Sequence, residues 1–314
     1  MTTYVIKRVL ALIPVLAVVA IVTFALIHMM PGDPAAVILG PEATAEQIEA
    51  LREELGLTAP LYVQFFAWLG DVLTGDLGTS VFTRDPVTQM LVTALGPTVS
   101  LAVLAQLLAL FIAIPAGIIA ARRRGTLVDQ GMMGGALLGI SVPSFLLGLL
   151  LMLVFAVWLQ WFPVAGYAPL SEGLGRHLQF LVLPAVALGT MQAALIARMT
   201  RSSMLDVFSQ NYMKTAKAKG LSEWIQVIKH AFRNAALPVL TVVGQGFGVL
   251  IAGAAVVETV FNIPGIGQLI VNSVERRDFV VIQGVVLMIA VVYVLVNLVV
   301  DLLYSVLDPR VRFD

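Results

Sequence analysis

Cysteine is absent from this chain of 314 residues, and charged residues make up only 12 % of it. Without cysteine, the protein forms neither disulfide bonds nor thiolate metal sites. The three histidines, His28, His177 and His230, lie far apart and form no HExxH pattern, so we predict no metal site. The formal net charge is zero, which gives no indication of nucleic-acid binding.

Sequence patterns of nucleotide-binding and hydrolytic enzymes are missing as well. The chain contains no GxxxxGK[ST] phosphate-binding loop, no GxSxG motif and no HExxH motif. Its apolar runs hold no paired acids that would indicate a proton relay or hydrolysis inside a membrane. We therefore predict a non-catalytic protein without a cofactor. Any ATP hydrolysis that drives it would take place on another chain.

Hydrophobic residues, in contrast, are abundant and make up 59 % of the chain. This proportion is typical of an integral membrane protein. A bilayer core about 30 Å thick needs about 20 apolar residues of helix. Six runs meet this requirement, so we predict an all-α membrane protein with six transmembrane helices, at 9–29, 98–121, 131–159, 178–197, 237–260 and 280–304.

The distribution of lysine and arginine predicts how these helices are oriented. Six spans place both ends of the chain on one side, and 14 of the 19 lysines and arginines lie on that side. Because positive charge concentrates in cytoplasmic loops, both termini are predicted to be cytoplasmic. The first run is longer than a signal peptide's apolar region of about 7 to 15 residues, and no small-residue cleavage pattern follows it, so we predict a retained span.

Four regions follow from this topology. Residues 1–30 form the first transmembrane helix, 31–97 an outer insertion, 98–304 a core of five transmembrane helices, and 305–314 a cytoplasmic tail. The basic segment 200–236 within the core is predicted to be a cytoplasmic loop. Each of its lysines and arginines would cost about 2.5 to 3.5 kcal/mol at the centre of a bilayer.

The outer insertion contains two helix patterns. Thr44 and Gln47 have the spacing of a capping box, an apolar stripe follows them, and Gly56 is placed to end the helix. The stretch "APLYVQFFAWLGDVLTG" then predicts a second, more hydrophobic amphipathic helix near the lipid headgroups. We therefore predict a small helical domain rather than a long irregular loop.

Two predicted spans carry rows of glycine. Gly131, Gly135 and Gly139 recur every four residues in the third span, and Gly244 and Gly248 have the same relation in the fifth. Such rows let helix backbones approach closely. The neighbouring helix belongs either to this chain or to a partner subunit.

Polar and helix-breaking residues inside the spans are candidates for a transport pathway. Prolines interrupt spans two, three and four, and the proline of "SVPSF" has serine on both sides. A broken helix with polar neighbours needs a cavity or protein around it, and an ordinary packed kink is the alternative. The acid near the outer end of span five is either functional or reaches the outer headgroups. The candidate pathway or gate residues are Ser141, Pro143, Ser144, Gln245 and Glu258.

The basic loop contains the stretch "NYMKTAKAKG", for which three roles compete: orientation, binding of anionic lipid, and docking of another protein. On a helical wheel, Lys214 and Lys217 point one way and Lys219 nearly the opposite way. This arrangement lacks the broad apolar and basic faces of a helix that lies on a membrane. Gly220 is placed as a left-handed C-cap residue and Ser222 as the N-cap of the next helix.

The segment "YMKTAKAKGLSEWIQVIKHAFRNAALPVLT" closely resembles the cytoplasmic "EAA" loop of permease subunits in ATP-binding-cassette importers, specifically their peptide branch. Further matches follow in order along the chain, including "MPGDP", "GDLGTS", "SVPSF" and "VVETVFNIPGIGQL". They are similar to that branch's first permease, which has a long outer insertion. Two departures are that Lys214, Thr215 and Ala216 stand where the general motif has Glu-Ala-Ala, and that Lys217 replaces the branch's usual arginine, which loses a planar two-pronged donor.

The resemblance implies the type I importer permease fold and a transport mechanism in the bacterial cytoplasmic membrane. Two homologous permeases pair, each docks its loop helix on one of two cytosolic ATP-binding subunits, and a periplasmic or lipid-anchored binding protein delivers the substrate. The outer insertion would be periplasmic and would contact the binding protein or the partner permease. The implied ATPase-coupling residues are Tyr212, Thr215, Ala216, Lys217, Ala218, Lys219, Gly220 and Leu221.

Dipeptides, oligopeptides or glutathione are the substrates that the resemblance favours. Opines and nickel chelates are alternatives, because importers of these compounds share the same loop and scaffold. A self-sufficient secondary carrier and a membrane enzyme are alternatives of other classes. Inverted repeats or a buried acid would support the carrier, and a catalytic constellation would support the enzyme.

Overall fold

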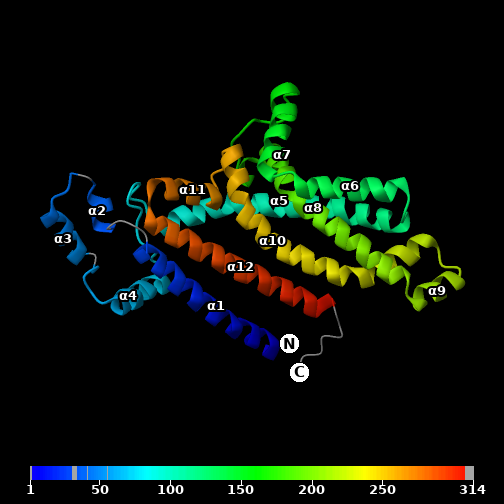
Figure 1. The fold of residues 1–314 in the computed structure, drawn as a ribbon, viewed down its shortest axis with the longest axis horizontal. Coiled ribbons are helices and arrows are strands. Elements are labelled where there is room, and N and C mark those ends of the chain that lie inside the picture. The colour runs from blue at the N-terminus through cyan, green and yellow to red at the C-terminus, as the bar shows by residue number, and fades with distance from the viewer. Residues whose placement is uncertain (1, 30–33, 41, 55, 308–314) are drawn as a thin grey trace. The chain divides into compact units, whose positions relative to one another are not determined.

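The computed structural model describes residues 2–29, 34–40, 42–54 and 56–307, and these residues are helical with no strand. The chain divides into two compact units, which are described separately. Unit 1 contains residues 94–268 and 293–314 with the first five residues, and unit 2 contains 6–93 and 269–292. The elements drawn in Figure 1 are α1 (Thr2–Met29), α2 (Pro34–Leu39), α3 (Ala45–Glu54), α4 (Leu61–Thr74), α5 (Val87–Arg122), α6 (Leu127–Ser141), α7 (Ser144–Leu151), η1 (Met152–Trp158), η2 (Leu170–Glu172), α8 (Leu174–Phe208), α9 (Asn211–Ala218), η3 (Ile225–Phe232), α10 (Arg233–Phe261), α11 (Ile266–Arg276) and α12 (Phe279–Leu307).

Helix α8 forms the centre of unit 1 and packs against α6, α7 and α10. Its large side chains Leu181, Ile196 and Met204 are fully buried. Small residues also bring it close to α5, since any side chain at Gly189 would overlap the backbone of Ala105. Close approach through small residues is a common way for helices to pack in membranes. The predicted all-α membrane fold is confirmed.

The two glycine rows differ in what surrounds them. Side chains at Gly244 and Gly248 of α10 would overlap Val300 and Tyr293 of α12, so this row packs within the chain. In the third predicted span, a side chain at Gly135 would meet no atom within 4 Å. Gly135 lines an open cavity of about 240 Å³ among α5, α6 and α8.

Only one of the three prolines that were predicted to interrupt spans separates two helices. Pro115 and Pro184 lie inside the continuous helices α5 and α8, so the prediction is wrong for both. At Pro143 the chain bends by 103° between α6 and α7. Val142 is extended there, with φ −87° and ψ 121°, as expected of a residue that precedes proline.

Within the part of the chain that the structure describes, four helices are long and apolar enough to cross a membrane, and the bent pair α6 and α7–η1 gives a fifth candidate. All five overlap predicted spans. The remaining prediction, 9–29, falls in α1, whose described apolar stretch is the shorter Leu10–Ala25. Three helices extend well past the predicted limits: two continue into the basic loop, and α5 begins at Val87 within the predicted insertion. The four long helices are Val87–Arg122, Leu174–Phe208, Ile225–Phe261 and Phe279–Val300.

Unit 2 contains the helices that were predicted for the outer insertion. The capping box of α3 is confirmed: Thr44 N donates to Gln47 Oε1 at 2.9 Å, and Gln47 N donates to Thr44 Oγ1 at 3.3 Å. The helix ends before Gly56, whose φ is +67°. The predicted second helix is α4, and its Phe65 packs edge-on against Phe24 of α1 with 5.3 Å between ring centres.

Candidate functional site

The predicted coupling segment forms the eight-residue helix α9, which Figure 1 shows at the end of unit 1 where α8 ends. Two hydrogen bonds close its C-terminus, from Gly220 N to Lys217 O at 3.0 Å and from Leu221 N to Ala216 O at 3.4 Å. This pair is a Schellman motif, which requires a left-handed residue at the position of Gly220. Gly220 has φ +70°, so the predicted C-cap is confirmed.

A second helix begins directly after this turn. Ser222 takes the predicted N-cap position, because its carbonyl accepts the N–H of Gln226 at 3.0 Å. The side chain of Gln226 also donates to Leu221 O at 2.6 Å, which holds the turn closed. The helix continues through the π-helical segment η3 into α10, so the loop is joined to a membrane span without a break.

One face of α9 packs on the protein's own core. Met213 and Ala216 are only 6 % and 7 % exposed. They belong to an apolar cluster with side chains from α5, α8, η3 and α10, which we call the α9 seat. Besides these two residues, the α9 seat contains Ala121, Met204, Val227, Ala231 and Ala235.

Two residues of the loop pattern that lie far apart in sequence meet at this helix. The Asn234 side chain donates to Tyr212 Oη at 2.9 Å and to His230 O at 2.9 Å. Tyr212 therefore helps to hold α9 against the start of α10. The sequence contains both residues as part of one loop pattern, but gives no indication that they bond to each other.

The opposite face of α9 is open to solvent. Lys214, Thr215 and Ala218 are exposed, as are Lys217 and Lys219. The predicted coupling residues thus fall into two groups, one that supports the helix and one that is exposed. Ala216 belongs to the first group because its buried side chain faces the α9 seat, which corrects the prediction that it contributes to the docking contact.

The candidate pathway residues do not form a single cluster. Ser141 is exposed at the end of α6, and its hydroxyl donates to Leu137 O at 2.9 Å. Pro143 and Ser144 lie at the 103° bend that follows. Gln245 lies exposed on α10. Among the described residues, no hydrogen bond joins these side chains to one another.

Glu258 is fully buried, which excludes the alternative that it reaches the outer headgroups. Its carboxyl group accepts the Thr98 hydroxyl at 2.6 Å and the Gln268 N–H at 3.0 Å. Thr98 Oγ1 in turn accepts the Ile266 N–H at 2.8 Å. Since the first N–H groups of a helix have no partner within the helix, these two side chains satisfy the first turn of α11. A side chain at Gly265 would overlap the Glu258 carboxyl group, so glycine is required there.

Replacing Glu258 with alanine is expected to lower the stability of the folded chain by about 1 to 3 kcal/mol for each donor left without an acceptor, namely the buried Thr98 hydroxyl and the partly buried Gln268 N–H. The Glu258→Gln variant keeps an acceptor oxygen and should lose less. Thermal unfolding of the detergent-purified protein measures the difference. The control is Glu275→Ala, because Glu275 is exposed on α11. Equal midpoints for Glu258→Ala and this control would contradict the assignment.

Comparison with known proteins places these features in a family. Residues 113–313 match the family described as binding-protein-dependent transport system inner membrane component, and residues 1–102 match the corresponding N-terminal family. The chain is 46 % identical to the probable peptide ABC transporter permease protein y4tP of Sinorhizobium fredii, over the full length of both proteins. It is also 46 % identical, again over both full lengths, to the glutathione transport system permease protein GsiC of Escherichia coli.

A solved structure supports the fold. The chain aligns with a structure titled as an inward-facing conformation of the MetNI methionine ABC transporter, with a TM-score of 0.59 and 16 % identity. The alignment covers 70 % of this chain and 97 % of the other.

Proposed function

The chain belongs to the family of binding-protein-dependent transport system inner membrane components, and from this premise we propose how it takes part in transport. It is a non-catalytic permease subunit of an ABC importer in the inner membrane, and it works in a complex with an ATPase and a binding protein. We propose that this complex contains a second homologous permease and two ATP-binding subunits. The chain lacks a phosphate-binding loop, so ATP hydrolysis takes place on the partner chains.

We propose that the exposed face of α9 is the surface that binds an ATP-binding subunit. The observation that carries this proposal is the division of α9 into a buried and an exposed face. Met213 and Ala216 fix the helix to the α9 seat, while Thr215 and Ala218 leave a small-residue surface open. Small side chains let another backbone approach closely, and the glycine turn keeps the helix short and rigid.

Coupling through α9 has to carry a substantial free energy. Shifting the ratio of the outward-facing to the inward-facing state from about 1:99 to 99:1 requires a ligand or partner to bind the favoured state more tightly by about 5.5 kcal/mol. A helix on a flexible loop could move without moving the membrane spans. Helix α9, in contrast, is connected on one side to α8 and on the other to the η3–α10 helix. Closure of the ATPase dimer would therefore move membrane-spanning helices together with α9.

The proposed topology has both termini in the cytoplasm and the insertion 31–97 in the periplasm. Concentration of lysine and arginine on the side of the termini supports this orientation. The proposed pathway passes the bend at Pro143, with Ser141, Ser144 and Gln245 as its polar groups. An exposed amide on a membrane-spanning helix is costly in lipid, which supports a position facing water or a partner subunit for Gln245.

The proposed substrate is a peptide or glutathione. The relatives' names support it, since y4tP is named for peptides and GsiC for glutathione, and both match over their whole length. The substrate can be identified by isolating the intact complex with its binding protein and analysing the bound ligand by mass spectrometry. A bound opine or nickel chelate would replace the peptide proposal with the alternative of the same architecture.

Purification through a tag on this chain from native membranes tests the complex itself. We expect a second permease and two ATP-binding subunits to be recovered with it. A secondary carrier or a membrane enzyme would be recovered alone, and that outcome would overturn the proposed function.

Neutralising Lys214 is expected to change uptake by less than about twofold, because exposed single charges contribute little to binding energy. In the described part of the chain, its ammonium group donates to Asn211 Oδ1, at 3.3 Å within the same helix. Uptake is measured for complexes with Lys214→Gln and with the wild-type chain, each reconstituted in vesicles of the same lipid composition. Loss of the ATP-binding subunits from Lys214→Gln would show that the contact depends on this lysine rather than on the small residues Thr215 and Ala218.

A further inference from the structure

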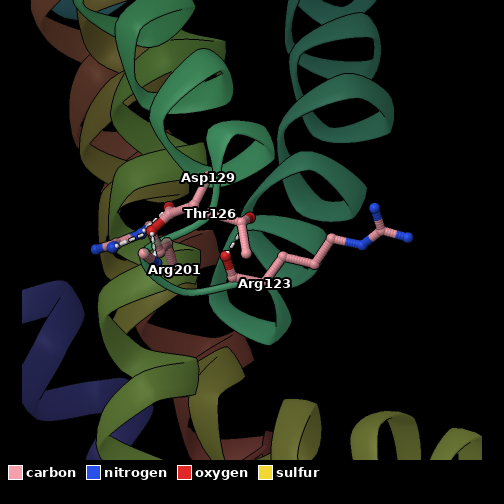
Figure 2. A network of polar contacts seen from close by, with 5 residues as sticks. Arg123, Thr126, Asp129 and Arg201 are labelled. Carbon is pink, nitrogen blue, oxygen red and sulfur yellow. Dashed lines mark hydrogen bonds and ion pairs between the residues drawn. The ribbon is translucent and has the colours of Figure 1, made fainter.

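An ion pair with a buried carboxylate and a partly exposed guanidinium joins α8 to the start of α6 (Figure 2). Arg201 Nε donates to Asp129 Oδ1 at 2.6 Å, and its terminal Nη2 donates to Asp129 Oδ2 at 2.7 Å. The Asp129 side chain is only 5 % exposed. Two parallel bonds between a guanidinium and a carboxylate fix the orientation of both side chains as well as their distance.

The same acid also organises the turn between α5 and α6. Asp129 Oδ2 accepts the N–H of Gly125 at 2.9 Å, and Thr126 Oγ1 donates to Arg123 O at 2.6 Å. Asp129 lies in the first turn of α6, where the helix dipole favours a negative charge. The Asp129 side chain therefore bonds both to the backbone of the turn 122–129 and to Arg201 of α8.

A second ion pair ties this turn to the other side of α9. The Arg122 guanidinium bonds to the Glu223 carboxylate, with Nε to Oε1 at 3.0 Å. Glu223 follows α9 in the chain and Arg201 precedes it. The turn 122–129 thus holds the chain both before and after α9. The Glu223 side chain is 70 % exposed, so this pair is the weaker of the two.

We propose that the turn 122–129 is a brace that transmits movement of α9 to α5 and α6, with Asp129 as its positioning residue. The proposal rests on the proposed function, because the brace is useful only if a partner moves α9. A buried or partly buried ion pair adds little stability compared with apolar packing of the same volume, but losing one partner leaves the other without its bidentate bonds, here the partly exposed Arg201 or the buried Asp129 carboxylate. This property suits an element that must keep one geometry while force passes through it.

Transport by the whole complex, reconstituted in lipid vesicles with its binding protein, tests the brace. Uptake of labelled glutathione and of a labelled dipeptide is divided by the ATP hydrolysed over the same time. We expect Asp129→Asn to lower uptake per ATP by about tenfold while the ATP-binding subunits stay bound, because Arg201 loses its bidentate partner. Arg201→Lys keeps the charge with a single point donor and should give an intermediate value.

Three controls separate coupling from folding. The exchange of both charges, Asp129→Arg with Arg201→Asp, restores the pair but removes the acceptor of the Gly125 N–H, so it should recover uptake per ATP only in part, to a value above that of Asp129→Asn. Asp206→Asn removes an exposed acid of α8 and should behave as the wild type. Glu223→Gln should lower uptake per ATP by less than about twofold.

The outcomes also separate this inference from the proposed function. A wild-type chain that is purified without ATP-binding subunits would overturn both. If Asp129→Asn shows the same uptake per ATP as a wild type that transports, the brace proposal alone would be overturned. Absence of both Asp129→Asn and the charge-exchanged protein from the membrane would assign the pair to folding and would also overturn the brace.

Discussion

Replacing Gly220 with valine is expected to lower ATP-driven uptake by about tenfold or more while the permease remains in the membrane. Gly220 has φ +70°, and the space around its Cα is open, so the cost of valine comes from the backbone rather than from a clash. A left-handed conformation costs an ordinary residue about 1 to 2 kcal/mol, and a β-branched residue is disfavoured further. Relief of this strain would break both hydrogen bonds that end α9.

The effect on α9 should be large because the helix is short. Eight residues do not form a stable helix by themselves, so α9 depends on its closed end and on the α9 seat. The amount of ATP-binding subunit that is recovered with each variant measures the loss directly. We expect Gly220→Val to recover about one tenth of the wild-type amount or less.

Gly75→Val is the matched control for this experiment. Gly75 has φ +87°, ends the outer helix α4 with the same kind of turn, and also has open space around it. It shares the backbone strain of Gly220 but not the proposed partner, so Gly75→Val should keep its ATP-binding subunits. Equal recovery from the two variants would contradict a specific role for the α9 turn.

The second large effect is expected when aspartate replaces alanine on either face of α9. Ala216 is 7 % exposed within the α9 seat, and burying an unpaired carboxylate there costs several kcal/mol. Ala216→Asp should therefore detach α9 from the α9 seat, which makes the loop sensitive to added protease and abolishes uptake. The resemblance places Ala216 among the coupling residues, whereas its burial attributes the expected loss to the α9 seat.

Ala218→Asp is expected to abolish uptake by a different route. Ala218 is exposed, so the aspartate stays hydrated and α9 stays on the α9 seat. Protease resistance of the loop should remain that of the wild type, while recovery of the ATP-binding subunits falls by about tenfold, because a charge enters the proposed contact. Normal recovery with Ala218→Asp would show that the contact face lies elsewhere on α9.

Local signals in the sequence predicted the ends of helices well. The capping box of Thr44 and Gln47 and the left-handed glycines Gly56 and Gly220 follow from spacing and from steric limits on the backbone. Each of these features depends on residues within one or two turns. A sequence shows such neighbours directly, and for this reason the prediction of α9 and its end was correct.

Features that depend on distant residues could not be predicted in the same way. A helical wheel shows that α9 has faces, but the residues that bury one of them come from four other elements, among them Ala121 and Met204. Asp129 and Arg201 are 72 positions apart, so the sequence gives no indication that they form an ion pair. Arg201 contributed only to the predicted orientation in the membrane. Pro143 bends the chain by 103° while Pro184 does not break its helix, since packing decides whether the helix continues past the proline.

Cross-linking from α9 tests the central claim most directly, because the chain has no cysteine and a single introduced cysteine is unique within it. Cysteine is placed at Ala218, a photoreactive reagent is attached to it in the isolated permease, and the complex is then assembled with its ATP-binding subunits. The control position is Leu73, which is 79 % exposed on the outer helix α4. The account predicts a cross-link from position 218 to an ATP-binding subunit and none from position 73. Cross-links from position 218 only to lipid, or to the permeases alone, would contradict it.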